Sequence, residues 1–206
     1  MAQILKENIK EKIIENTRQA LLEGDYLSFN LRDIAKKTEI SLSNIYNYFP
    51  SKEALLEGVL EDLLADFDKA TTKIQKTLKN KKKLLYLNFD KSRTHAKTIM
   101  SFILKHKTSL YILAHKVKGS KLDTFLDEWA KDYAKLEYQS LKLKAKEHKD
   151  LMKNLPSEFF VENLCGFFFT SVKKLVAQDL DEKSLKKYLE EIFAFIYQGW
   201  DYYAEF

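Results

Sequence analysis

Hydrophobic side chains recur along most of the chain at intervals of three or four residues, the spacing of amphipathic helices. In the first segment Leu5, Ile9, Ile13 and Leu21 form one apolar stripe, and Gly24 ends the pattern. Further helices are expected at 31–38, 42–48, 51–77, 83–92, 94–117 with a break near Lys107, 121–149, 157–178 and 182–204. The pattern predicts an all-α protein of about nine helices, with an amino-terminal domain of three helices followed by a larger helical domain.

Capping residues mark several of these boundaries. Suitable side chains stand directly before the expected helices at Asn30, Ser41, Ser51, Ser157 and Asp181, and Ser120 with Asp123 resembles a capping box with the shorter acid. Pro50 prevents the helix at 42–48 from continuing. Two short helices at 31–38 and 42–48, with three residues between them, form a helix-turn-helix pattern.

The stretch LSNIYNYFPSK, residues 42–52, combines aromatic rings with small polar side chains. Ile45 and Phe49 are four residues apart and can anchor one face of a helix. The residues that then point outward are Ser43, Asn44, Tyr46 and Asn47. Amides can pair with both N6 and N7 of adenine, and hydroxyls can reach a base or a phosphate. The stretch is therefore predicted to be a recognition helix that lies in the major groove of double-stranded DNA.

The run LRDIAKKTEISLSNIYNYFPSKEALL, residues 31–56, resembles the helix-turn-helix of the tetracycline-repressor (TetR) family. The matching residues are Asn30 in the place of a threonine, Arg32, Ile34, Ala35, Ile40, Ser41, Tyr46, Phe49, Ser51, Lys52, Glu53 and Leu55. The motif covers about an eighth of the chain, and the chain length, the first helix and the long helical remainder also resemble that family. In two places the chain departs from the family's glycines, with Glu39 in the turn and Ser43 in the recognition helix. If the turn needs a left-handed residue, Glu39 costs about 1–2 kcal/mol there.

The resemblance implies a dimeric transcriptional repressor that leaves its operator, expected to be an inverted repeat, when a small molecule binds. The single cysteine fits a cytoplasmic location, and the aromatic residues of the chain favour a largely apolar effector. It implies a DNA-binding domain at residues 1–50, a connecting helix at about 51–77, and an effector-binding and dimerisation domain within 51–206. The DNA contacts that it implies are Arg32 from the second helix, Ser41 and Lys52 on phosphates, and Ser43, Asn44, Tyr46 and Asn47 in or beside the groove.

The last two predicted helices are apolar on more than one face, which a helix needs when it is buried on several sides. One face can pack on its own domain and another on a second copy, so that two helices from each subunit form a four-helix bundle. The residues expected at this homodimer interface are Phe168, Val172, Leu175, Phe193, Ile196, Tyr197 and Trp200. The alternative is the ordinary core of a monomer.

Aromatic residues and two histidines in the middle of the chain are candidates for an effector pocket. They are Phe102, His106, Tyr111, His115, Phe125, Trp129 and Tyr133. They equally describe a packed core, so a DNA-binding protein that answers to a protein partner, or to no ligand, stays open as an alternative. The four histidines form no metal-ligand or catalytic motif and the chain has no phosphate-binding glycine loop, so neither an enzyme nor a metal or other cofactor is predicted.

The composition further narrows the possible classes of fold and function. Five glycines and two prolines leave few tight turns, which disfavours a strand-rich fold, and the single cysteine, Cys165, excludes an internal disulfide. The net charge of +5 is uneven, at −1 over residues 1–60, +9 over 61–150 and −3 over 151–206. The charge alone therefore does not identify a nucleic-acid surface, and the lysine-rich middle is expected to be a solvated face. No apolar run is long enough to cross a membrane, and the amino terminus lacks the pattern of a signal peptide.

Overall fold

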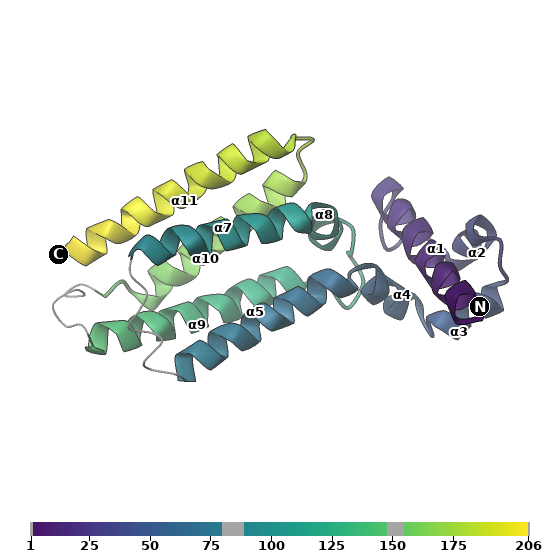
Figure 1. The fold of residues 1–206 in the computed structure, drawn as a ribbon, viewed down its shortest axis with the longest axis horizontal. Helices are drawn as coiled ribbons and strands as arrows, with labels where there is room; N and C mark the ends of the chain where they lie inside the picture. The colour runs from purple at the N-terminus through teal and green to yellow at the C-terminus, as the bar shows by residue number, and fades with distance from the viewer. Residues whose placement is uncertain (1, 80–88, 148–154, 206) are drawn as a thin grey trace. The chain divides into compact units, whose positions relative to one another are not determined.

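The computed structural model describes residues 2–79, 89–147 and 155–205 of the 206-residue chain. The regular structure of these residues is helical, in ten helices (Figure 1). By their packing they form two compact units, which we call the amino unit (up to Asp66, with Thr108–Leu126) and the carboxy unit (Phe67–Lys107, with Asp127 onward). The all-α fold predicted from the sequence is confirmed, whereas a functional boundary after residue 50 stays a prediction.

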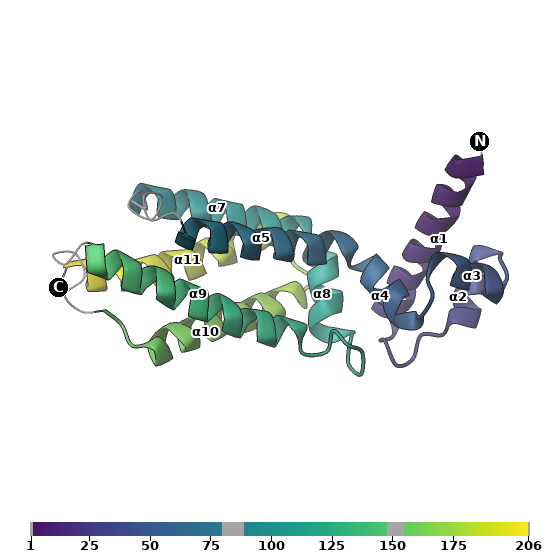
Figure 2. The ribbon, with the colours of Figure 1, turned by 90° about the horizontal axis from the view of Figure 1, so that it is seen from below.

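The amino unit is built on four helices near the start of the chain. These are α1 (Ala2–Glu23), α2 (Leu31–Thr38), α3 (Leu42–Tyr48) and α4 (Lys52–Val59), and α1 packs against α2 and α4 while α2 packs against α3 (Figures 1 and 2). Ile13, Leu21, Ile34, Ile45 and Leu55 form a closed apolar core between them. Burying each such side chain contributes about 1.5–3 kcal/mol, so these few helices are held mainly by this core. Later in the chain, α8 (Lys107–His115) adds the buried Ile112 and Leu113 to the same unit.

The predicted caps of the short helices are present. Asn30 Oδ1 accepts a hydrogen bond from the backbone N–H of Arg32 at 2.7 Å, and Ser51 Oγ accepts one from Ala54 at 3.0 Å. After α2 the chain turns through Glu39, whose φ of 61° and ψ of 38° are left-handed. The turn thus does place Glu39 in the left-handed conformation that the sequence analysis considered only as a condition.

The prediction of a single helix over 51–77 is wrong, because the chain forms α4 and then α5 (Glu61–Lys79). The break lies at Leu60, whose backbone N–H is shared between the carbonyls of Leu56 at 3.2 Å and Glu57 at 3.1 Å. Such sharing tightens the last turn of a helix. The fully buried Leu60 side chain keeps this turn in the core of the amino unit.

The carboxy unit contains most of α5 together with α7 (Phe89–Lys105), α9 (Phe125–Glu147), α10 (Glu158–Val176) and α11 (Glu182–Glu205). These helices run alongside one another, and α7 packs against α11 (Figure 2). Ile103, Val161, Leu185 and Leu189 are buried between them. None of the helices in the described ranges combines the length and the hydrophobicity that a membrane crossing requires.

Several helix ends in this region differ from the prediction. The helix α7 runs without a break from Phe89 to Lys105, so the expected boundary at 92–94 is wrong, while residues 83–88 of that expectation lie outside the described part of the chain. The break near Lys107 is confirmed. The helix α9 begins at Phe125 rather than 121, because Ser120 and Asp123 bond to the N–H groups of Leu122 and Gly119 and close a turn instead of a helix end.

The two last helices begin as predicted. Ser157 Oγ accepts from the N–H of Phe160 at 3.2 Å, and Asp181 Oδ1 accepts from the N–H of Ser184 at 2.8 Å. The bonds to Ser184 hold the pKa of the Asp181 carboxyl below its ordinary value. Both side chains therefore satisfy backbone donors that a helix start leaves open.

Candidate nucleic-acid interface

The helix α3 is fixed to the amino unit by its inner face. Ile45 and Phe49 are buried, as the sequence predicts, and the N–H of Phe49 bonds to the carbonyl of Ile45 at 2.9 Å. At the start of the helix, Ser41 Oγ accepts from the N–H of Asn44 at 3.1 Å. The short helix thus has a defined beginning, end and rotation about its axis.

The outer face of α3 carries the side chains predicted to meet DNA. Ser43 and Asn47 are exposed, Asn44 is half-buried, and Tyr46 is 47% exposed. Asn47 Nδ2 lies 3.5 Å from Asn44 Oδ1, so the two amides are neighbours on the surface. Arg32 is exposed on α2, the other helix of the pair. The structure therefore places hydroxyl, amide and guanidinium groups where another molecule can reach them.

Lys52, a candidate for contact with a DNA phosphate, lies against aromatic rings that the sequence analysis did not place beside it. Its Nζ lies 4.5 Å from the ring centroid of Tyr26 and 4.4 Å from that of Phe29, both from the loop between α1 and α2. Burial lowers the pKa of the Lys52 ammonium, and the carboxylates of Asp25 and Glu53 oppose this effect. Two aromatic side chains three residues apart in this loop were the sequence signal for this contact.

A second loop, between α8 and α9, holds these residues in place. The N–H of Tyr26 donates to the carbonyl of Lys116 at 2.7 Å, and Lys116 Nζ donates to the carbonyl of Gly24 at 2.8 Å. The Tyr26 hydroxyl donates to Glu53 Oε1 at 2.7 Å, and Glu53 Oε2 lies 3.4 Å from the N–H of Lys121. Burial and the bond to Glu53 raise the pKa of Tyr26 to about 12. The loop at 116–121 is therefore a structural part of the amino unit, which the sequence did not indicate.

Two short helices joined by a left-handed turn, the second with a buried inner face and a polar outer face, define a helix-turn-helix module. Residues 13–59 match the family described as bacterial regulatory proteins, tetR family. The resemblance to the TetR family noted in the sequence is confirmed over these residues.

Two relatives extend the comparison. The HTH-type transcriptional regulator YuxN of Bacillus subtilis (strain 168), itself uncharacterized, is 32% identical over 140 residues, which are 61% of this chain. The matched part spans 46% of that relative, somewhat less than half of its length. A 2.07 Å crystal structure of a protein from Syntrophomonas wolfei str. Goettingen, assigned to the TetR family, is 20% identical with a TM-score of 0.58. The alignment covers 92% of this chain and 93% of that one, and it shows that the fold is shared.

The predicted effector residues fall into two groups. Phe102, His106, Trp129 and Tyr133 belong to the carboxy unit, where Phe67 joins them: its ring centroid lies 5.3 Å from that of Phe102 and 4.8 Å from that of Trp129. Trp129 and Tyr133 are stacked at 5.3 Å. Tyr111, His115 and Phe125 belong to the amino unit, and the rings of Tyr111 and His115 lie 5.3 Å apart. The sequence prediction thus mixed two ring clusters, and ligand contact by any of these residues stays a prediction.

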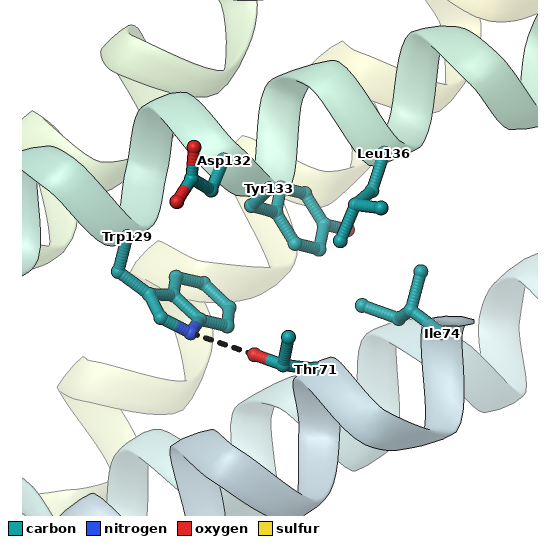
Figure 3. Close-up of a pocket in the computed structure, with 6 residues that line it drawn as sticks. All are labelled: Thr71, Ile74, Trp129, Asp132, Tyr133 and Leu136. Carbon is teal, nitrogen blue, oxygen red and sulfur yellow. Dashed lines mark hydrogen bonds between the residues drawn. The ribbon is translucent and has the colours of Figure 1, made fainter. Parts of the chain in front are cut away.

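A small cavity of about 70 Å³ lies beside the stacked pair in the carboxy unit (Figure 3). Its lining residues are Thr71, Ile74, Trp129, Asp132, Tyr133 and Leu136. Trp129 Nε1 donates to Thr71 Oγ1 at 3.0 Å and so joins α9 to α5. Pockets for drug-sized ligands measure roughly 300–1,000 Å³, so this cavity in its present form holds only a much smaller molecule.

The residues expected at a dimer interface are mostly turned inward. Val172, Leu175 and Phe193 are buried within the single chain, and Phe168 and Ile196 are half-buried. The rings of Phe168 and Phe193 lie 5.5 Å apart. Placing Val172, Leu175 and Phe193 on a partner-facing surface was therefore wrong, because they fill the core of the carboxy unit; the side chains of Tyr197 and Trp200 lie outside the described part of the chain.

A different apolar surface on the same two helices is open. Phe159 is 75% exposed and Phe167 is 47% exposed on α10, and Phe195 is 68% exposed on α11. The centroids of Phe167 and Phe195 lie 6.4 Å apart, so the surface continues from one helix to the other. We call Phe159, Phe167 and Phe195 the exposed phenylalanine face. Exposed and buried phenylalanines lie close together along the same helix, as Phe195 and Phe193 do on α11, so the sequence did not separate the two sets.

Proposed function

We propose that the chain is a sequence-specific DNA-binding transcriptional regulator that acts in the cytoplasm as a homodimeric repressor. The observation that carries the proposal is the helix α3, which buries Ile45 and Phe49 and leaves amide and hydroxyl side chains exposed. A recognition helix needs this division, since one face is fixed to its domain and the other enters the major groove. The match to the TetR family and the relative named as a transcriptional regulator support it.

Each residue is assigned a DNA contact according to the chemical group of its side chain. Asn44 and Asn47 offer amides to base edges, where an amide can pair with adenine, and Ser43 offers a hydroxyl beside them. The exposed Tyr46 ring carries its hydroxyl away from the helix toward a backbone phosphate. Arg32 and Ser41 make further contacts to the duplex.

Binding to a polyanion requires local positive charge, because residues 1–60 have a net charge of −1. Arg32 and Lys36 are exposed on α2, while the nearby Lys37 is 3.6 Å from Glu23 and is partly neutralised. Each phosphate that a cation neutralises contributes about 0.9 to the log–log slope of affinity against salt. We therefore expect DNA binding that weakens steeply with salt.

A second copy of the chain is the proposed partner for the exposed phenylalanine face. Apolar faces of this kind on a folded chain mark association surfaces, and obligate dimers bury roughly 2,000 Å² or more. Pairing of this face about a two-fold axis would join α10 and α11 of both subunits in a four-helix bundle. Two recognition helices about 34–36 Å apart would then read the two halves of an inverted repeat.

Release from DNA by a small, largely apolar effector is the finer part of the proposal. The ring cluster around Phe67, Phe102, Trp129 and Tyr133 is the proposed site, and the rings would have to move apart because the cavity is about 70 Å³. That small volume favours a second candidate, a dimeric DNA-binding protein that a protein partner controls or that has no effector. In a thermal-shift screen against hydrophobic compounds, a saturable rise in melting temperature that also weakens DNA binding supports the first candidate. Its consistent absence supports the second.

The DNA-binding proposal is tested by comparing Tyr46→Ala with Asn44→Ala on a panel of duplexes that differ at single base pairs. Tyr46→Ala should weaken binding to all of them alike, because a phosphate contact carries no sequence information. Asn44→Ala should change the preference at one base pair, by about 1–3 kcal/mol of discrimination. If both variants behave in the same way, the assignment of the two faces is wrong.

A further inference from the structure

The ammonium of Lys52 lies in a corner formed by two aromatic rings. The centroids of Tyr26 and Phe29 are 5.8 Å apart with an interplanar angle of 76°, so one ring meets the other edge-on. Lys52 Nζ is 4.5 Å and 4.4 Å from these two centroids. Both distances are well inside the roughly 6 Å over which a cation is attracted by a ring face. Two such contacts restrict a side chain that otherwise samples many rotamers.

The corner itself is rigid. Both rings are buried in the amino unit, and their backbone is fixed by bonds from the N–H of Tyr26 to Lys116 and from the N–H of Phe29 to Asp25, at 2.7 and 3.1 Å. The Tyr26 hydroxyl is held by Glu53, the residue next to Lys52. The position of the ammonium is therefore set by residues from three separate parts of the sequence.

One side of Lys52 stays accessible. Lys52 is half-buried rather than enclosed. It is the first residue of α4 and follows Pro50 and Ser51, which connect α4 to α3. An exposed lysine loses much of its rotamer freedom when it binds a phosphate. A lysine that two rings already hold has lost part of that freedom in the free protein, so its phosphate contact costs less.

We propose that Tyr26 and Phe29 are positioning residues that hold the Lys52 ammonium ready for a DNA backbone phosphate. This inference rests on the proposed DNA-binding function and adds two residues that do not themselves touch DNA. The rings act through Lys52, so their removal weakens binding only as long as Lys52 is present.

The test is a double-mutant cycle with Phe29→Leu and Lys52→Met, measured on a duplex enriched from a random pool. We expect Lys52→Met to lower the log–log salt slope by about 0.9 for each phosphate lost. Phe29→Leu should weaken binding on the order of tenfold per subunit in the wild-type background and leave affinity nearly unchanged in the Lys52→Met background. An equal loss in both backgrounds overturns the proposal, because it would show a structural effect that does not pass through Lys52.

Tyr26→Phe and Tyr26→Leu form a matched pair for the second ring. The first keeps the ring and removes only the bond to Glu53, so it should retain most of the affinity, whereas the second should lose as much as Phe29→Leu. Affinities are compared below the melting temperature of each variant. If Tyr26→Phe loses as much affinity as Tyr26→Leu, the ring is not what positions Lys52.

A measurement without DNA separates this proposal from the proposed function. In the NMR spectrum of lysine-labelled protein, ring currents should move the Lys52 Cε protons upfield of the other lysines, and Phe29→Leu should move them back. An ordinary shift in the wild type overturns the positioning contact whether or not the protein binds DNA. An upfield shift in a protein that binds no duplex overturns the proposed function and the phosphate role with it. Normal DNA binding by Lys52→Met overturns the phosphate role alone.

Discussion

The backbone of Gly58 in α4 lies directly against the ring of Phe49, the residue that follows α3. A Cβ atom at Gly58 would come within 2.6 Å of Phe49 Cε1 and 3.3 Å of its Cζ. Real Cβ contacts are not that short, so only glycine lets the ring take this place. The ring in turn fixes the inner face of the candidate recognition helix.

Gly58→Ala is therefore expected to destabilise the protein. Alanine favours a helix over glycine by about 1 kcal/mol, but crowding a buried ring costs about 1–3 kcal/mol, so we expect a net loss of up to about 2 kcal/mol in the free energy of unfolding. Urea denaturation measures it. In the Phe49→Leu background the smaller side chain relieves the contact, so Gly58→Ala should cost less there; an equal cost in both backgrounds would show that Phe49 is not the obstacle.

Glu39→Gly is expected to stabilise the protein. Glu39 has a φ of 61°, a conformation that costs a residue with a side chain about 1–2 kcal/mol and costs glycine nothing comparable. Because glycine also gains freedom in the unfolded chain, the net gain should be about 1 kcal/mol. Glu39→Ala is the control: it removes the same carboxylate but keeps a Cβ, and a gain as large as that of Glu39→Gly would assign the effect to charge rather than to backbone conformation.

Ser41 caps α3 and has a proposed contact with DNA, and one pair of variants separates the two. Ser41→Ala removes the acceptor for the N–H of Asn44 and should cost about 1 kcal/mol of stability. Ser41→Asp keeps a good helix cap but brings a negative charge to the side proposed to face phosphates. We expect native-like stability with DNA binding weakened at least tenfold, a weakening that shrinks as salt is added. Unchanged DNA affinity for Ser41→Asp would place Ser41 away from the duplex.

The exposed phenylalanine face predicts where the proposed dimer can be broken. Phe195→Asp should convert the dimer to a monomer without loss of helix content, because the side chain is 68% exposed within the single chain and a charge in an apolar interface is costly. Sedimentation velocity measures the oligomeric state, and circular dichroism measures the helix content. Gln139→Asp, at an exposed position of α9, is the matched control and should stay dimeric. A Phe195→Asp protein that remains dimeric would move the interface elsewhere.

Local chemistry made much of the amino unit predictable. The caps at Asn30, Ser41 and Ser51 act within three residues of themselves, so their bonds can be inferred from sequence. The inward turn of Ile45 and Phe49 follows from helical spacing alone. The same reasoning failed at Ser120, because a serine followed three residues later by an acid can close a turn as well as begin a helix.

Contacts between distant parts of the chain were not predictable. Glu53 receives the hydroxyl of Tyr26 and lies near the N–H of Lys121, which is 68 positions away. Periodicity shows that α10 and α11 are apolar on several faces, but it does not show which face fills the chain's own core. Val172 and Phe193 were assigned to the partner for that reason, and the exposed Phe159, Phe167 and Phe195 were not among the assigned residues.

The most direct test of the account is selection of bound duplexes from a random pool by the full chain. We expect enrichment of an inverted repeat whose half-sites are centred about one helical turn apart, or a multiple of it, because two copies of α3 enter successive major grooves on one side of the DNA. A protein that enriches no duplex, or only a single half-site without its symmetric mate, would contradict it.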